Sequence, residues 1–362
     1  MIKVLVVSDL TGGLGGVYTY LQQIQSYTSK DISVHILFDA STKINVSGYY
    51  QFKSADFVPL SNKFYDEILI VESVKRAIKQ YSADIIHVVN GSIKSNLIIR
   101  EYLSETNIPF IVTEQYVDDS LLLDEISLNR IQKVNLSASH VIYVSNINLE
   151  IANKLFRIKT KNHSTIYNGV LPLKEKKKSY SKKPYRIFTS GRCVPQKGID
   201  TIIKAISLVP NYEIYFHLLG DGENKNEYLN LAKSILKSNH HFFIYGWAKQ
   251  LDYNSLTNYF DLYISASRQE GLSYSLLEAA TAGFPIICSD CSGNVELIEL
   301  CNRGNLFAKE DYQQLSSTLL SFLSNPYELN NKALFNTPLV DVEFNIEVLI
   351  TQLENIYRQN KQ

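Results

Sequence analysis

The sequence predicts an α/β protein with a doubly wound parallel sheet in each half of the chain. Short apolar runs alternate with segments of helical periodicity, a pattern typical of parallel strands covered by helices. A lysine-rich stretch that ends at Pro184 separates two such series and indicates a linker. Glycine-bearing turns follow several apolar runs, at the sheet edge where open parallel sheets bind ligands. At 362 residues, the chain can form two domains with separate cores.

The first series begins at residue 4, and helical patterns such as 68–81 and 97–105 fall between its apolar runs. These runs are short, rich in β-branched residues and bounded by turn signals, so they predict buried strands. The strands expected in this half are 4–7, 34–38, 85–89, 110–113, 141–144 and 165–167.

A glycine-rich turn, 11–17, follows the first strand and opens a helix expected over 18–27. It is not a dinucleotide-binding fingerprint, because G-x-G-x-x-G is absent. The turn either allows close helix packing or brings backbone up to a ligand at the carboxyl ends of the strands. We favour the second interpretation, in which Gly15 and Gly16 contact the ligand.

The second series begins with a strand at 186–190, and helices are expected at 312–323 and 344–358. Its other strands are 214–219, 242–245, 262–265 and 285–289. Because small ligands often bind between domains, we expect the two sheets to face each other across a cleft. We therefore divide the chain into a first domain (1–170), a basic linker (171–184), a second domain (185–342) and a C-terminal helix (343–362) that can pack back on the first domain.

The 36 basic and 36 acidic residues cancel, so no overall field draws the chain to nucleic acid. Residues 1–9 read as a strand rather than a signal peptide. No apolar stretch approaches the roughly 20 residues that span a bilayer. We expect a cytoplasmic protein. The linker lysines are best explained as a solvated segment, although they can also make a peripheral contact with the inner face of a membrane.

Four cysteines are present, and Cys288 and Cys291 have C-x-x-C spacing. Neither a second pair nor a histidine pair completes a zinc site. We therefore expect reduced structural thiols, with no metal and no disulfide.

The segment 261–285 carries the strongest signal for chemistry. An apolar run is followed by a glycine-bearing turn and the start of a helix, an arrangement that offers backbone N–H groups to an anion. We expect Glu270 in the loop and Glu278 one turn into the helix. An alternative is that Ser275 and Glu278 form a capping box, in which Glu278 only reaches back to a free amide.

A second candidate loop, 191–200, follows the first strand of the second domain. Its guanidinium, Arg192, and its ammonium, Lys197, lie on a loop bounded by Gly191 and Gly198. Such a pair can bind a diphosphate. The alternative is two exposed surface cations.

These loops together resemble the family 4 (group 1) retaining glycosyltransferases. RQEGLSYSLLEAATAGFP, at 268–285, is similar to the family's E-x7-E motif with its small-residue helix and Gly-x-Pro, and GRCVPQKG, at 191–198, to its G-R-x-x-x-x-K-G element. Gly220-Asp221-Gly222 and Gly246-Trp247 are further matches. The resemblance implies the GT-B fold, two Rossmann-like domains, and covers the second domain better than the first.

The resemblance also implies roles for these residues. Arg192 and Lys197 would neutralise the leaving diphosphate, Glu270 would bind a sugar hydroxyl and Glu278 the ribose. We take Arg192, Lys197 and Glu270 as the catalytic residues. No metal is required, because two cations are present. The donor-binding residues would be Gly15, Gly16, Gly191, Trp247, Leu272, Ser273, Tyr274 and Glu278.

One position departs from the family. After the fourth strand the family often carries a histidine that faces the donor sugar, and this chain has Gln115 there, preceded by Glu114. Glutamine donates and accepts hydrogen bonds but carries no proton at neutral pH. We expect Gln115 and Glu114 to contact the sugar or the acceptor.

The expected function is transfer of a sugar, with retention, from a UDP or GDP sugar to a hydroxyl of a glycan or lipid-linked glycan in polysaccharide or lipopolysaccharide assembly. No other cofactor is expected. Two alternatives remain: a nucleotide-sugar epimerase of the same fold, and a catalytically silent subunit that binds a donor or a partner enzyme.

Overall fold

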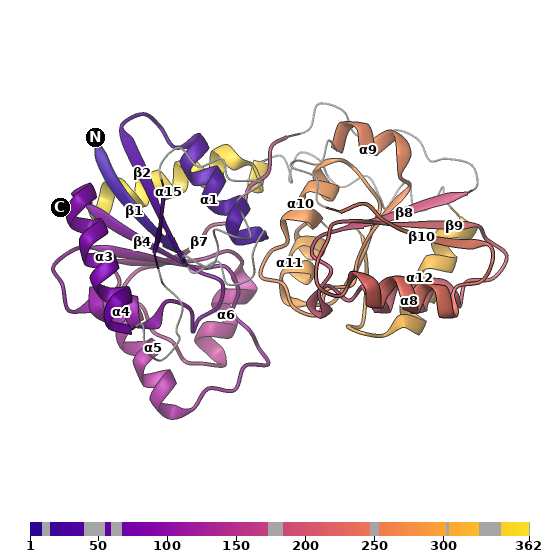
Figure 1. Cartoon of the computed structure of the whole chain (residues 1–362), viewed down its shortest axis with the longest axis horizontal. Coiled ribbons are helices and arrows are strands. Elements are labelled where there is room, and N and C mark those ends of the chain that lie inside the picture. Colours follow the sequence, from indigo (N-terminus) through magenta and orange to yellow (C-terminus); the bar gives the residue numbers. More distant parts are fainter. Residues whose placement is uncertain are drawn as a thin grey trace. The chain divides into compact units, whose positions relative to one another are not determined.

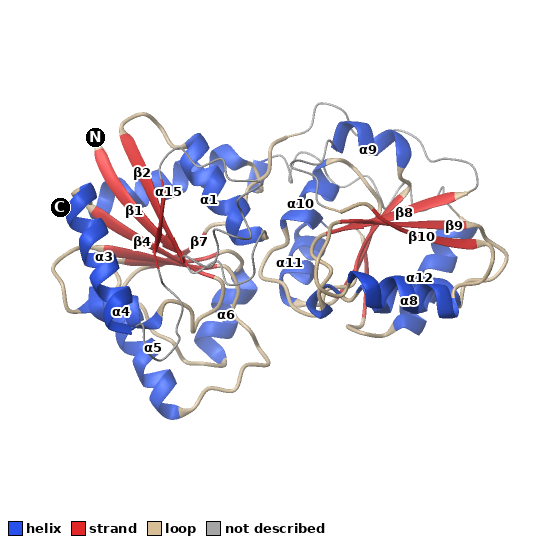
Figure 2. Cartoon of the chain, viewed as in Figure 1, coloured by secondary structure: helices blue, strands red, loops and turns tan. Residues whose placement is uncertain are grey.

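The computed structural model describes residues 1–8, 15–39, 55–58, 67–172, 184–246, 253–301, 304–325 and 342–361. The chain forms two compact units. The first combines Met1–Asn168 with Ile346–Gln362, and the second is Gly169–Asn345. In each unit helices cover a parallel sheet (Figure 1), and Figure 2 shows the strands at the centre of each unit.

The sheet of the first unit has the order β3-β2-β1-β4-β5-β6-β7, and every neighbouring pair is parallel. Its central strands β4 and β5 are buried at every residue and β1 at all but Lys3, as is typical of a parallel sheet covered on both faces. The strands are β1 (Ile2–Ser8), β2 (Ile32–Asp39), β3 (Ala55–Val58), β4 (Ile85–Asn90), β5 (Phe110–Glu114), β6 (His140–Tyr143) and β7 (His163–Thr165). The helices are α1 (Gly16–Tyr27), α3 (Glu67–Tyr81), α4 (Leu97–Ser104), α5 (Glu125–Ser137), α6 (Asn146–Lys154) and α15 (Ile346–Asn360).

Helix α15 comes from the end of the chain but belongs to the first unit, where it lies beside α1 (Figure 1). A buried polar chain attaches it. His87 on β4 contacts the Tyr357 hydroxyl through Nδ1, at 2.7 Å, and Thr113 Oγ1 through Nε2, also at 2.7 Å. The Glu354 carboxylate also accepts a hydrogen bond from the Ser29 amide at 2.6 Å. The last helix is therefore part of the core of the first unit.

The sheet of the second unit has the order β10-β9-β8-β11-β12-β13 and is also parallel throughout. Helices α7, α8 and α12 share one core with the apolar side chains of its strands. The strands are β8 (Tyr185–Ser190), β9 (Ile214–Leu219), β10 (His240–Ile244), β11 (Leu262–Ser265), β12 (Ile286–Ser289) and β13 (Asn305–Phe307). The helices are α7 (Ile199–Ser207), α8 (Lys225–Ile235), α9 (Tyr253–Tyr259), α10 (Tyr274–Thr281), α11 (Ser292–Cys301) and α12 (Tyr312–Ser324), with a 3-10 turn, η1, at Pro195–Lys197.

The predicted strands are confirmed, with shifts at their ends. The strand expected at 165–167 is β7, which ends at Thr165, although the Ile166 amide still bonds to the Tyr143 carbonyl. The helix expected from residue 344 begins at Ile346, because the Phe344 carbonyl accepts from the Val170 amide instead. Strands β3 and β13 were not predicted, since runs of this length carry little periodicity.

The cleft expected between the domains stays a prediction, and most of the predicted linker, 173–183, lies outside the described residues. In the part of the chain that the structure describes, no helix is long and apolar enough to cross a membrane. All four cysteines are buried and none forms a disulfide.

The buried His87 predicts how stability depends on pH. Burial lowers its pKa from 6.5 to about 3. Between these pH values the unfolded chain binds a proton that the folded chain does not. The stability that neutral His87 contributes is therefore complete above about pH 6.5 and is lost as the pH falls towards 3.

The check is denaturant unfolding across this pH range. His87→Gln should show a shallower loss of unfolding free energy on acidification than the wild type. His163→Gln, a change at an exposed histidine, should retain the wild-type slope. An unchanged slope in His87→Gln would contradict this explanation.

Candidate active site

The candidate site lies where the strand order of the second unit reverses. Strands β8 and β11 are neighbours at the centre of the sheet, and the chain leaves β8 towards β9 on one side and β11 towards β12 on the other. Loops 191–198 and 266–273 follow these two strands at their carboxyl ends. Open α/β sheets bind ligands at this switch point, because the two loops diverge there. Both motifs singled out in the sequence fall on these loops.

Glycine allows the two loops to approach each other. Gly198 has a φ of +60°, and a Cβ added there would lie 2.0 Å from the carbonyl oxygen of Ala266. A side chain is therefore excluded both by the left-handed backbone and by the opposite loop. Gly220, after β9, similarly approaches the carbonyl of Gly191, where an added Cβ would lie at 1.8 Å. The start of loop 191–198 is therefore packed against the next strand's end.

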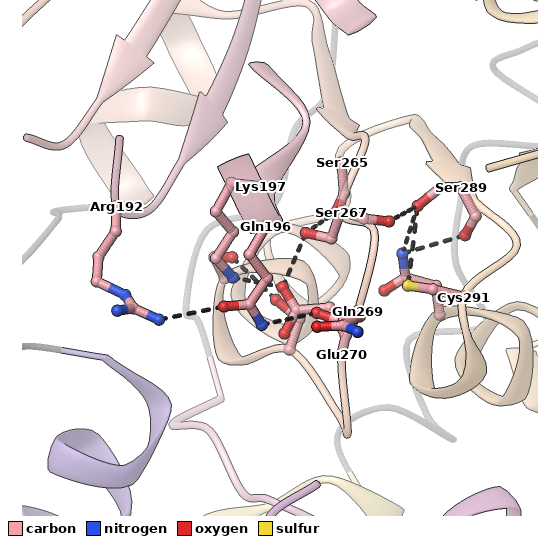
Figure 3. A network of polar contacts seen from close by, with 12 residues as sticks. Arg192, Gln196, Lys197, Ser265, Ser267, Gln269, Glu270, Ser289 and Cys291 are labelled. Carbon is pink, nitrogen blue, oxygen red and sulfur yellow. Dashed lines mark hydrogen bonds and ion pairs between the residues drawn. The ribbon is translucent and has the colours of Figure 1, made fainter. Parts of the chain in front are cut away.

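An ion pair joins the two loops (Figure 3). Lys197 Nζ contacts Glu270 Oε1, and the side chains are 18% and 11% exposed. Ser267 Oγ donates to the same carboxylate oxygen at 2.8 Å. The pair joins residues far apart in the sequence, and it places a cation and a carboxylate side by side with part of each still open to solvent.

Gln196 makes a second connection between the loops. Its Oε1 accepts from Arg192 at 3.3 Å, and its Nε2 donates to the Gln269 carbonyl at 2.9 Å (Figure 3). Its own backbone carbonyl accepts from the Arg268 amide at 2.8 Å. Arg192, Gln196, Lys197 and Glu270 therefore form one polar network.

The backbone of Glu270 is fixed from the other side by α11. The Glu270 carbonyl accepts from Ser292 Oγ at 2.7 Å and from the Gly293 amide at 3.3 Å. A Cβ at Gly293 would lie 2.0 Å from the Gly271 carbonyl oxygen, so α11 can begin this close to the loop only with glycine. The position of the Glu270 carboxylate is thus set by both its backbone and its side chain.

Arg268, in loop 266–273, makes further contacts to loop 191–198 and to the start of α7. Its guanidinium donates to both carboxylate oxygens of Asp200, at 3.0 and 3.1 Å, to Glu310 at 2.7 Å and to the Pro195 carbonyl. Burial alone would raise the pKa of Asp200, but hydrogen bonds and charge from Arg268, followed by Lys204, bring that pKa below its ordinary value. Arg268 is thus engaged in holding the loops together.

Helix α10 begins at Tyr274, with Ser273 as its N-cap. Ser275 therefore lies inside the helix, so the capping box of Ser275 and Glu278 is wrong. The Ser275 hydroxyl instead accepts from Tyr263 at 3.0 Å. Glu278 is half-buried one turn into α10, and Glu270 lies in the preceding loop, as predicted. Since the first N–H groups of a helix have no partner within it, this terminus can receive an anion.

In the first unit the neighbouring residues Glu114 and Gln115 have different surroundings. Glu114 is completely buried, 3.4 Å from Arg100, and accepts from Asn90 Nδ2 at 3.1 Å. Such a buried pair is typical of a protein core, and the sugar or acceptor contact predicted for Glu114 stays a prediction. Gln115 is 7% exposed, and its Oε1 accepts from Asn168 at 3.3 Å. Its buried Nε2 makes no hydrogen bond within the described residues.

Gly15 is the N-cap of α1 and Gly16 is its exposed first residue. Residues 11–14 of the same turn and the predicted donor contact Trp247 lie outside the described residues. Among the residues that the structure describes, no group of three or more His, Cys, Asp or Glu side chains is placed to hold a metal ion.

Comparison with known proteins identifies the second unit. Residues 172–336 match the family model described as glycosyl transferases group 1. This part of the chain belongs to the group 1 glycosyltransferases. An uncharacterized glycosyltransferase of Methanocaldococcus jannaschii is 24% identical over 365 residues, covering 99% of both chains. WclY of Escherichia coli, an O-antigen biosynthesis glycosyltransferase, is 29% identical over 203 residues, covering 53% of this chain and 54% of WclY.

Solved structures share the fold of the whole chain. HepE of Anabaena, in complex with UDP, superposes with a TM-score of 0.78 at 17% identity, covering 99% of this chain and 100% of HepE. The fold is therefore GT-B, as the sequence predicted. Among the curated relatives that it matches, the chain spans between 30% and 99% of the relative's own length.

The sequence located the two loops but missed several residues that organise them. Gln196 lies inside the motif at 191–198 and Ser267 directly before the motif at 268–285, yet nothing in the spacing indicates their partners, since each contact depends on the fold. Arg268 is the first residue of the motif at 268–285, but its place in the sequence gives no sign of its partners. Gly293 carries a signal, a glycine within a helix, whose packing reason becomes visible only in the structure.

The close approach at Gly198 predicts a large effect of a small substitution. Gly198→Ala should destabilise the second unit by more than the roughly 1–3 kcal/mol of a left-handed backbone, because the added methyl also meets the Ala266 carbonyl. Denaturant unfolding measures this loss. Gly91→Ala is the control, since a Cβ there meets only Ser95 Oγ at 4.0 Å. Equal stabilities of the two variants would contradict the contact.

Proposed function

We propose that this glycosyltransferase transfers a sugar, with retention of configuration, from a nucleotide-diphosphate sugar to a hydroxyl group of a glycan or glycolipid. The observation that carries the proposal is the group formed by Arg192, Lys197 and Glu270 at the switch point of the second unit. It combines cations, a carboxylate and the N-terminus of α10 at one edge of the sheet.

The proposed chemistry follows the charge that develops. The bond between the sugar's anomeric carbon and the diphosphate oxygen breaks, and its electron pair goes to that oxygen. Arg192, Lys197 and the amides near Leu272, Ser273 and Tyr274 stabilise the growing negative charge, which is electrostatic catalysis by groups already in place. The acceptor oxygen bonds to the same face of the sugar, and its proton goes to the leaving diphosphate.

The Lys197–Glu270 pair suggests how the charges of the site are compensated before the donor binds. Before the donor binds, each charge has the other as its partner, so neither is left uncompensated. An arriving diphosphate gives Lys197 a second anionic partner. Glu270 can then accept a hydrogen bond from a sugar hydroxyl while Ser267 continues to orient it. We assign Glu278 to the ribose.

We propose UDP or GDP sugars as donors and no divalent metal. The cations of loop 191–198 can supply the positive charge that a metal would otherwise bring to the diphosphate. UDP is favoured by the fold similarity to HepE, whose structure contains it. Gly15, Gly16, Gly191 and Trp247 remain proposed donor contacts.

We propose cell-surface polysaccharide or lipopolysaccharide assembly as the setting. The support is the likeness to an O-antigen glycosyltransferase and, over 107 residues at 31% identity, to LpsE of Rhizobium meliloti, a lipopolysaccharide core biosynthesis glycosyltransferase. A lipid-linked acceptor would bring the protein to the cytoplasmic face of a membrane, in peripheral contact with it.

Gln115 is the proposed sugar contact on the first unit. Its Oε1 is held by Asn168, which leaves the Nε2 group as a donor for a hydroxyl oxygen. A neutral amide suffices in this role if the diphosphate receives the acceptor's proton.

The function is tested by incubating the protein with a panel of UDP and GDP sugars and candidate acceptors, with and without a chelator, and detecting products by mass spectrometry. We expect a glycosylated product in both conditions, and NMR of that product should show the anomeric configuration of the donor. Interconversion of the donor without an acceptor would indicate an epimerase. Donor binding without any turnover would indicate a silent subunit.

The cation pair predicts a specific loss of affinity. Arg192→Ala or Lys197→Ala should weaken binding of free UDP or GDP by roughly 10- to 150-fold, the range for a lost charge-assisted hydrogen bond. Titration calorimetry measures the affinities. Lys233→Ala, a change at an exposed lysine on α8, should have no effect. Unchanged affinity in both site variants would remove them from the diphosphate site.

The proposed sugar contact of Gln115 predicts a larger effect on catalysis than on nucleotide binding. Because its proposed contact is with the sugar, Gln115→Ala should lower kcat for the native donor by about tenfold, the value of one hydrogen bond, and change UDP or GDP affinity by much less. Steady-state kinetics and calorimetry together provide the test. A loss of nucleotide affinity as large as the loss of kcat would contradict the assignment.

A further inference from the structure

Gln196 occupies an unusual place, in the 3-10 turn between Pro195 and Lys197. Pro195 restricts the start of the turn, and Gly198 ends it in the left-handed conformation. The backbone of Gln196 is also held by the opposite loop, through the hydrogen bond from the Arg268 amide. From this fixed backbone, Lys197 extends to Glu270 while Gln196 extends to Arg192 and Gln269 (Figure 3).

The chemistry of its neighbours fixes which way the Gln196 amide faces. A guanidinium only donates hydrogen bonds and a backbone carbonyl only accepts them. The oxygen of the amide must therefore face Arg192, and its nitrogen must face the Gln269 carbonyl, as observed at 3.3 and 2.9 Å. Only a side chain with both an acceptor and a donor at this reach can make both contacts. A carboxylate of the same length cannot donate to Gln269.

The Gln196 contact also differs in charge from the contact of Lys197. Lys197 contacts a carboxylate, whereas Gln196 brings Arg192 a neutral oxygen. A neutral acceptor orients a guanidinium without competing, as a negative charge would, with an incoming diphosphate.

We propose that Gln196 is a positioning residue for the diphosphate site. It orients Arg192 towards the diphosphate without adding negative charge, and it ties Arg192 to the loop that carries Glu270. This inference rests on the proposed function, because it assumes that Arg192 binds the diphosphate. It goes beyond that function by assigning part of the affinity for the diphosphate to a neutral residue.

The test compares Gln196→Glu and Gln196→Met with the wild type by calorimetry, using UDP, GDP, uridine and guanosine as probes. Gln196→Glu should weaken binding of the diphosphate that the wild type prefers by at least about tenfold, because the carboxylate competes for Arg192 and repels the Gln269 carbonyl. Gln196→Met, which loses both hydrogen bonds but adds no charge, should lose less. Binding of the matching nucleoside should be unchanged in both. In the activity assay, Gln196→Glu should raise the donor KM by a larger factor than it lowers kcat.

Gln132 offers a matched control in the first unit. Its side chain also makes one acceptor and one donor contact, with the Lys159 amide at 2.9 Å and the Lys159 carbonyl at 3.3 Å. Gln132→Glu should leave all four affinities unchanged.

The outcomes distinguish a failure of this inference from a failure of the proposed function. Equal loss of diphosphate and nucleoside affinity in Gln196→Glu would mean that Gln196 only supports the fold, and would overturn the inference. Wild-type affinity for the diphosphate in Gln196→Glu would overturn it as well. If the wild type bound neither diphosphate, the proposed function would fail, and the inference with it.

Discussion

Contact between the loops after β8 and β11 is the constraint on which the site depends. At Gly198 the left-handed backbone and the nearby Ala266 carbonyl leave no room for a side chain. This approach brings residues that are far apart in sequence within hydrogen-bonding distance, and each further tie, from Gln196 to Gln269 or from Lys197 to Glu270, depends on it. Because β8 and β11 are adjacent where the strand order reverses, the topology itself brings these loops together.

The polar network positions charged side chains before a ligand binds, and it pairs partly buried charges with opposite charges, which lowers the free-energy cost of burying them. Lys197 and Glu270 compensate each other, and Arg268 is occupied by Asp200, Glu310 and the Pro195 carbonyl on the outer side. Arg268 therefore links the loops without being one of the two cations, Arg192 and Lys197, that we assign to the diphosphate. Groups fixed in advance need little rearrangement when charge develops, which is the physical basis of electrostatic catalysis.

Sequence reasoning located both loops and all the strands but β3 and β13, because these features depend on local patterns. Strand β11 is a short apolar run, and α10 follows a glycine-bearing turn, so each could be recognised without its neighbours. The approach of Gly198 to Ala266, the partners of Gln196 and the burial of Glu114 beside Arg100 could not be predicted, since they depend on which strands become neighbours. The capping box at Ser275 failed for a related reason: the N-cap lies two residues earlier, at Ser273, and local spacing alone does not fix where a helix starts.

The central claim is that loops 191–198 and 266–273 together form the diphosphate site. A crystal structure of the protein with the nucleoside diphosphate that it binds tests this most directly. The account predicts that the diphosphate oxygens lie within hydrogen-bonding distance of Arg192, Lys197 and the first amides of α10, and that Gln196 still contacts Arg192. A diphosphate bound elsewhere, with the Lys197–Glu270 pair and the α10 terminus untouched, would contradict it.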